Sequence, residues 1–123
     1  MLRWRIIFTR GEELKYLSHL DLMRLWERAL RRAALPLAYS LGFSPHPRLS
    51  LAVPLAVGVT SQAELVDIYL TRPIAPNLLK AAVAAQMPRG LEVLEANPVH
   101  LTAPSIPSQV RWAEYRVQLK TER

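Results

Sequence analysis

Residues 3–9 alternate between two kinds of side chain, and this alternation most constrains what the chain can fold into. One face of the extended segment would carry Trp4, Ile6 and Phe8, and the other Arg3, Arg5, Ile7 and Thr9. A hydrophobic period of two is typical of a strand that buries one face. We therefore expect a strand whose aromatic face packs against helices and whose arginine face stays open.

A helix is predicted to begin at Ser18. This serine is a favourable N-cap residue, and Asp21 follows three residues later, as in a capping box. One apolar stripe with helical spacing comprises Leu22, Leu25, Trp26, Ala29 and Ala33. The opposite side carries Arg24, Arg28, Arg31 and Arg32. Glu27 is spaced to pair with Arg31, and Leu35-Pro36 should end the helix.

The remaining periodicities complete a compact pattern. Strands are expected at residues 49–55 and 64–71, joined by a turn at 57–61. A second helix should run from Pro76 to Met87, and a short strand should occupy 91–95. The order strand, helix, strand, strand, helix, strand predicts a ferredoxin-like α+β fold. Such a fold has a four-stranded antiparallel sheet with both helices on one face.

This pattern also predicts the domain organisation. Residues 1–96 should form the ferredoxin-like domain, and residues 97–109 a proline-rich linker. Alternation resumes at 110–123, which indicates an extra strand and resembles the start of a second half. An unpaired strand of this kind could join two copies of the chain into a dimer.

The composition excludes several classes of protein. The 123 residues suffice for one domain, and the absence of cysteine excludes disulfides, iron–sulfur clusters and cysteine nucleophiles. No stretch approaches the ~20 apolar residues of a membrane-spanning helix. Phosphate-loop, dinucleotide and nucleophile-elbow motifs do not occur, so no cofactor is expected. We expect a cytoplasmic protein that does not associate with membranes.

The charge balance points towards an anionic partner. The formal net charge is +6, and thirteen of the 16 basic residues are arginines. The planar guanidinium suits phosphate, which favours RNA or another polyanion as the partner. A solvated basic surface without a partner explains the same charge equally well.

Two polar segments are the candidate site. The first holds His19 and Asp21 at the start of the predicted helix, and the second is Ser44-Pro45-His46-Pro47-Arg48. Candidate catalytic residues are His19, His46 and Asp21. Candidate phosphate-binding residues are Ser44, Arg48, Arg24, Arg28 and Arg31. Because the prolines stiffen the second segment, it could hold an anion with little loss of entropy.

We expect folding to bring these two segments into one cleft. A metal site built from His19, Asp21 and His46 is conceivable, but no short histidine pair supports it, and no metal is expected. The alternative is that both histidines are ordinary surface or cap-adjacent residues.

Three segments carry a resemblance to a known family. They are Leu17-Ser18-His19-Leu20-Asp21-Leu22-Met23, the helical stretch Glu27 to Ala33, and Tyr39-Ser40-Leu41-Gly42-Phe43-Ser44-Pro45-His46-Pro47-Arg48. In these residues, and in Pro54 to Gly58 and Asp67-Ile68, the chain resembles the radical-SAM-linked proteins, a bacterial family of uncharacterised domains. The resemblance covers roughly residues 3–96.

The resemblance implies an accessory domain that serves a radical S-adenosylmethionine (SAM) protein, with a role in binding or positioning RNA for modification or processing. Such a partner enzyme needs three cysteines for its cluster, and this chain has none, so any radical chemistry belongs to the partner. Family members usually continue past position 123. The family's catalytic residues are not established, so none are transferred to this chain.

Two other functions are compatible with the sequence. A looser, fold-level likeness to CRISPR repeat-processing endonucleases suggests metal-independent RNA cleavage, with His19 or His46 moving protons and Arg48 holding the phosphate. A structural interaction module with no site is the third possibility.

Overall fold

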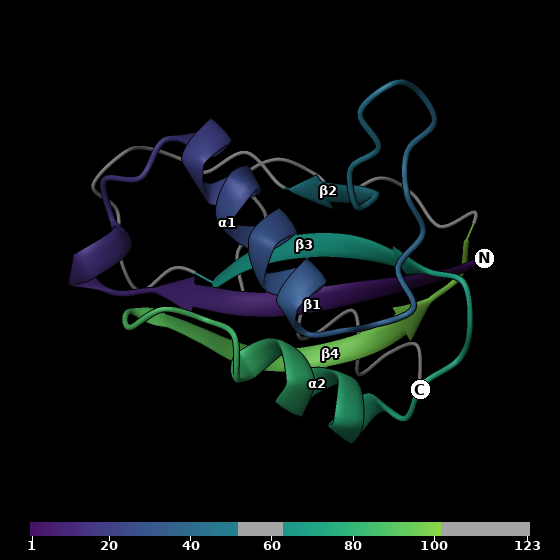
Figure 1. Ribbon diagram of the computed structural model, residues 1–123. Coiled ribbons are helices and arrows are strands. Elements are labelled where there is room, and N and C mark those ends of the chain that lie inside the picture. Colours follow the sequence, from purple (N-terminus) through teal and green to yellow (C-terminus); the bar gives the residue numbers. More distant parts are fainter. Residues whose placement is uncertain (52–62, 102–123) are drawn as a thin grey trace.

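The sheet of this protein is built around its first strand. The computed structural model describes residues 1–51 and 63–101, and the turn predicted at 57–61 and the extra strand at 110–123 lie outside them. The elements are β1 (Leu2–Arg10), the short 3-10 helix η1 (Glu12–Leu14), α1 (His19–Arg32), β2 (Leu49–Leu51), β3 (Ala63–Leu70), α2 (Pro76–Ala84) and β4 (Leu91–Val99). The strands pair antiparallel in the order β2-β3-β1-β4 (Figure 1).

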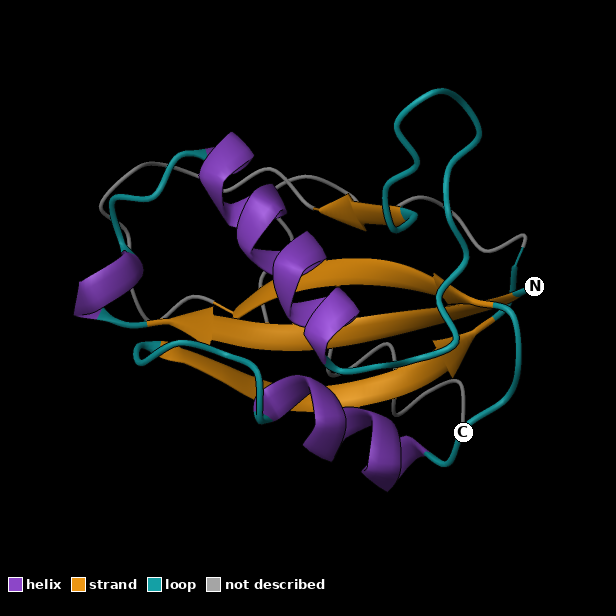
Figure 2. Ribbon diagram, viewed as in Figure 1, coloured by secondary structure: helices purple, strands orange, loops and turns teal. Residues whose placement is uncertain are grey.

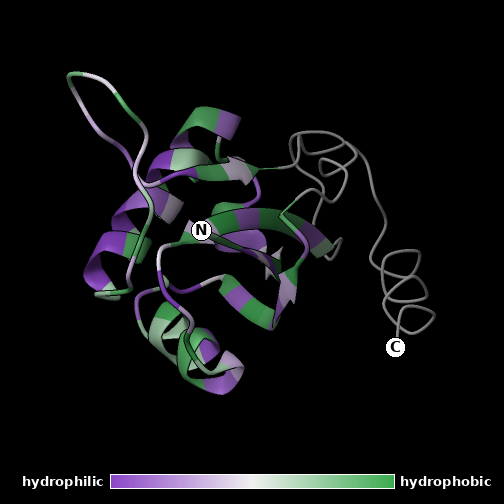
Figure 3. Ribbon diagram, turned by 90° about the vertical axis from the view of Figure 1, so that its right-hand side faces the viewer, coloured by the Kyte–Doolittle hydropathy of each residue, from purple (hydrophilic) through white to green (hydrophobic). Residues whose placement is uncertain are grey.

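This order, with both helices on one face, confirms the predicted ferredoxin-like α+β fold. Figure 2 shows both helices in front of the sheet, and the turned view in Figure 3 shows the same two layers from the side. Neither helix is long and apolar enough to cross a membrane, within the residues described.

The face of β1 that was predicted to be buried forms the core beneath the helices. Trp4, Ile6 and Phe8 belong to one buried cluster with side chains of α1 and α2. The Phe8 and Trp26 rings meet with centroids 5.0 Å apart and planes tilted by 60°. An aromatic pair of this geometry contributes beyond its area burial and ties α1 to the central strand.

Both helices begin as the sequence indicates. The Ser18 side chain caps α1 by accepting a hydrogen bond of 3.1 Å from the Asp21 backbone N–H. Pro76 occupies the first turn of α2, where its missing N–H costs nothing. Helix α2 ends at Ala84, three residues before the predicted Met87, because the chain there changes to shorter-range turn hydrogen bonds.

Strand β4 is longer than predicted. It continues to Val99, so that residues 97–99 of the predicted linker pair with β1. Pro98 is tolerated there because β4 is an edge strand. The pairing shifts between Ile7 and Phe8, opposite Glu95 and Val93, which leaves Leu94 as the extra residue of a β-bulge.

The second face of the sheet is not open, which corrects the expectation for Arg3 and Arg5. Arg3 is 6% exposed, and Asp67, which lies on the neighbouring strand β3, is fully buried. Asp67 accepts hydrogen bonds from Arg3 Nε at 2.8 Å and from Arg5 Nε at 2.7 Å. Sequence periodicity missed this arrangement because the countercharge lies more than sixty residues away along the chain.

The Asp67 clamp predicts a large and specific loss of stability. Asp67→Asn or Asp67→Ala removes a fully buried carboxylate that two largely buried guanidinium groups share, and breaking a buried ion pair in this way costs roughly 3–5 kcal/mol. Urea denaturation followed by circular dichroism measures this. The exposed Glu92→Gln removes the same charge and should change the free energy of unfolding by less than about 0.5 kcal/mol. Equal stability of Asp67→Asn and wild type would refute the clamp.

Candidate functional site

The two histidines of the candidate site lie at separate places along α1. His19 occupies the first helical position, whereas His46 Nδ1 lies 3.7 Å from Glu27 Oε2. Glu27 follows His19 by eight residues, which corresponds to about 12 Å along the helix axis. The single cleft expected from the sequence is therefore not formed. The described residues contain no group of three histidine, aspartate or glutamate side chains suited to a metal ion.

The segment around His46 forms a projecting loop with a paired base (Figure 1). Tyr39 and Pro47 form an antiparallel bridge, and the Ser40 N–H donates to the His46 carbonyl oxygen at 2.8 Å. The His46 N–H in turn donates to Ser40 Oγ at 3.1 Å. Ser44 lies exposed within this loop. We name residues 40–47 the projecting loop.

Helix α1 holds one side of the projecting loop. Arg31 Nη2 donates to the Pro45 carbonyl oxygen at 3.3 Å, and Glu27 faces His46. Glu27 and Arg31 thus each contact the loop, in place of the mutual ion pair that their spacing suggested. Local helical spacing could not reveal this, because the loop supplies closer partners.

Arg48 directly follows the projecting loop, and its side chain packs on Tyr69 of β3 instead of on α1. Its guanidinium carbon is 4.5 Å from the centroid of the Tyr69 ring, a cation–π contact. Tyr69 is paired with Arg3 across the sheet, so Arg48 belongs with the arginines of the second sheet face. It does not share a site with His19.

The exposed side of α1 is strongly basic, as predicted. We call Arg24, Arg28, Arg31 and Arg32 the arginine face. All four are exposed, and none forms an ion pair within the part of the chain that the structure describes. Arg24, Arg28 and Arg32 follow one another at intervals of four residues, so they form a row about 12 Å long.

Two hollows adjoin the arginine face. One, of about 410 Å³, lies among its four arginines and Glu27. The other, of about 700 Å³, is a groove between α1 and the chain that follows α2, where Gln86 and Met87 face Arg24, Arg28 and Arg32. Asp21 also lines this groove and is the one acidic residue among its lining side chains, beside three arginines. The sequence identified the arginines but not the wall that Gln86 and Met87 provide.

His19 belongs to a separate polar cluster at the other end of α1. Arg10 Nε forms an ion pair of 2.6 Å with Glu64 Oε2, and His19 lies close enough to Glu64 to act on its charge. Neither His19 Nδ1 nor Glu64 Oε1 has a hydrogen-bond partner among the described residues. Burial raises the pKa of Glu64 above its ordinary value of 4.5, with Arg10 and His19 opposing the shift.

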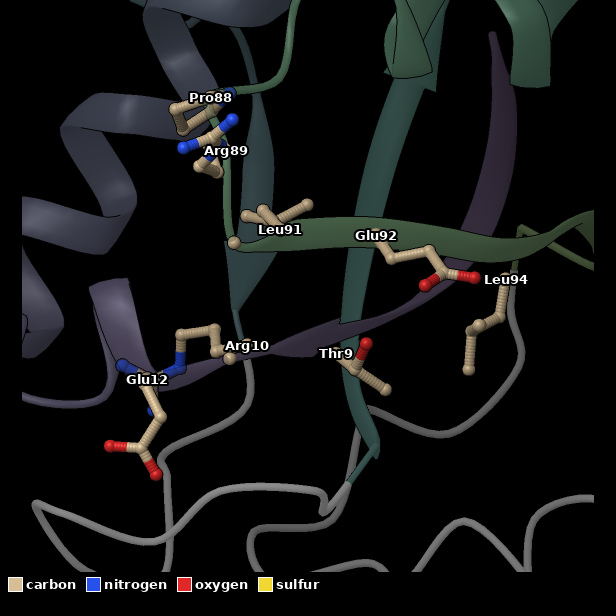
Figure 4. Close-up of a pocket in the computed structure, with 10 residues that line it drawn as sticks. Thr9, Arg10, Glu12, Pro88, Arg89, Leu91, Glu92 and Leu94 are labelled. Atoms are coloured by element: carbon tan, nitrogen blue, oxygen red, sulfur yellow. The ribbon is translucent and has the colours of Figure 1, made fainter.

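A third hollow, of about 780 Å³, lies where β1 and β4 meet the turns at Gly11 and Gly90 (Figure 4). Figure 4 shows Arg89 and Glu12 well apart along its wall, with Glu92 and Leu94 on β4. The charged residues that line this hollow include both arginines and glutamates, and they do not point to a common centre. The arginine face is therefore the strongest candidate for a ligand surface among the residues described.

Comparison with known proteins gives one match. A family model described as an uncharacterised protein conserved in bacteria (DUF2344) matches residues 3–123. No curated protein matches the chain.

The buried carboxylate of Glu64 makes stability depend on pH. Because its pKa is higher in the folded protein than in the unfolded chain, the folded state binds more protons, and stability falls as pH rises above about 4.5. The free energy of unfolding of wild type minus that of Glu64→Gln should therefore decrease between pH 4 and pH 7. Urea titrations across that range measure this difference, and an increase with pH would mean that the Arg10 ion pair outweighs burial.

Proposed function

This chain belongs to the bacterial family DUF2344 of uncharacterised proteins, and we propose that it is an accessory domain that binds RNA and positions it for a radical SAM partner. Membership brings no known activity, so the proposal rests on the surface of the domain. The observation that carries it is the arginine face, four exposed cations on one helix with no acidic partner in the described chain.

Phosphate is the ligand that this surface suits best. Guanidinium groups bind phosphate oxygens through a planar fork of donors. The arginine row is about 12 Å long, so it can contact several phosphates of one strand rather than a single small anion. The net charge of +6 attracts a polyanion from a distance as well.

An accessory role fits the positions of the polar residues better than RNA cleavage does. The cleavage that the sequence suggested would need His19 or His46 to act together with Arg48 on one phosphate. His46 faces Glu27, Arg48 stacks on Tyr69, and His19 lies at the far end of α1. The radical SAM partner comes from the sequence resemblance, and such a partner would supply the cluster that this cysteine-free chain lacks.

Removing the arginine row should weaken RNA binding and lower its salt dependence. The variant with Arg24→Gln, Arg28→Gln and Arg32→Gln loses three phosphate contacts. For single-stranded RNA the slope of log K against log salt should fall by about 2, and affinity near 0.1 M salt should fall by a factor on the order of ten. Fluorescence polarisation with a labelled oligonucleotide measures both quantities.

The matched control for that variant carries Arg72→Gln, Lys80→Gln and Arg89→Gln, three exposed cations that do not belong to α1. It has the same net charge. Equal losses in the two triple variants would mean that only total charge matters and would remove the arginine face as a site.

The partnership with a radical SAM protein predicts a complex. The tagged chain, expressed together with a radical SAM protein encoded beside it, should retain that protein on an affinity column in 0.15 M salt. Equimolar recovery by size-exclusion chromatography is the expected result. Separate elution of the two chains at micromolar concentration would count against the partnership, while leaving RNA binding to be judged by the polarisation assay.

A further inference from the structure

The tip of the projecting loop displays two apolar side chains that the rest of the domain does not cover. Leu41 is 101% exposed and Phe43 is 108% exposed, which means that neither packs against the fold. Gly42 between them has a φ of +130°, a conformation that other residues rarely adopt. Gly42 thus allows the backbone to reverse direction at the tip, and the two flanking side chains are exposed to solvent.

The loop that carries this tip is held in place at its base. The bridge between Tyr39 and Pro47 and the hydrogen bonds between Ser40 and His46 join its two sides. Pro45 and Pro47 restrict the backbone further, so little conformational entropy remains to be lost when the tip binds something. The base of the loop is thus fixed, while Phe43 at its tip stays uncovered.

The base of the same loop contacts the arginine face and the glutamate beside it. Arg31 contacts Pro45, two residues after Phe43, and Glu27 contacts His46. Glu27 is the single acid of the hollow among the arginines. A strand of phosphates on the arginine face would therefore pass the base of the loop whose tip carries Phe43.

The size and surroundings of the tip favour a nucleobase over a protein pocket. A stable protein–protein interface buries about 1,200–2,000 Å² and has an apolar centre. Here the apolar surface comprises two side chains, and the base of their loop contacts an arginine of α1. One ring, by contrast, suffices to stack one base, which changes affinity roughly 5- to 150-fold.

We propose that Phe43 stacks on an unpaired base of an RNA strand whose phosphates lie on the arginine face, so that the domain selects single-stranded over double-stranded RNA. This inference rests on the proposed function and adds the class of RNA. Duplex RNA contributes phosphates to the arginines but keeps its bases stacked in the helix, so it gains nothing from Phe43.

The experiment compares two RNAs and three variants of the full chain. Fluorescence polarisation is measured with a labelled 12-nucleotide oligouridine and with a 12-base-pair RNA duplex at the same salt. Phe43→Ala should weaken binding of the single strand about tenfold and change duplex affinity by less than twofold. Phe43→Tyr, which keeps the aromatic ring, should remain within about threefold of wild type on both RNAs.

Leu41→Ala is the matched control, because it removes an equally exposed apolar side chain that has no aromatic face. It should leave single-strand affinity within twofold of wild type. Equal losses for Leu41→Ala and Phe43→Ala would overturn stacking in favour of general apolar contact, as would an unchanged affinity of Phe43→Ala for the single strand. Because both side chains contact nothing in the fold, all variants should unfold at the wild-type urea concentration.

The two proposals fail in different ways. If wild type binds both RNAs and the arginine variant loses both, while Phe43→Ala does not discriminate between them, RNA binding stands and base stacking is wrong. If wild type binds neither RNA more tightly than the arginine variant does, both proposals are wrong.

Discussion

Asp67 is the residue on which the arrangement of the sheet depends. It is fully buried, and it accepts hydrogen bonds from Arg3 and Arg5 on the neighbouring central strand. A shift of one residue between β1 and β3 would turn these charged groups into the apolar layer beneath the helices, at a desolvation cost of several kcal/mol per ion. The clamp therefore selects the register and also decides which face of the sheet the helices cover.

With that register set, the helix layer follows from packing. Trp26 meets Phe8 on one side of α1, so the opposite side must face solvent, and the arginines that occupy it become a basic surface. The chain leaving α1 has to return to the edge strand β2, and on the way it forms the projecting loop. Contacts of Glu27 and Arg31 with this loop join its base to the basic surface. A core interaction thus positions surface residues that do not contact the core.

The candidate site differs from the one that the sequence suggested. His19 and His46 both stand out as polar residues near element ends, and their similarity invited the hypothesis of a shared cleft. Helix α1 separates them, because His46 docks against its third turn and His19 stands at its first residue. The exposed position of the arginines on one side of α1 was predicted correctly, because a helical period places them opposite the apolar stripe. Phe43 escaped notice because exposure of a single aromatic ring has no signature in the sequence.

The sequence by itself determined what depends on near neighbours: the strand alternation, the Ser18 cap, the apolar and basic sides of α1, and the element order that leads to a ferredoxin-like sheet. Each of these depends on residues a few positions apart. Only the tertiary structure decided the partners of Asp67, the length of β4, the separation of the two histidines and the docking of the projecting loop on α1. These involve side chains 14 to 64 positions apart, or strand pairs, from Arg10 with Leu91 to Arg3 with Val99, that are still further apart, and distance along the chain carries no information about which of many possible contacts will form.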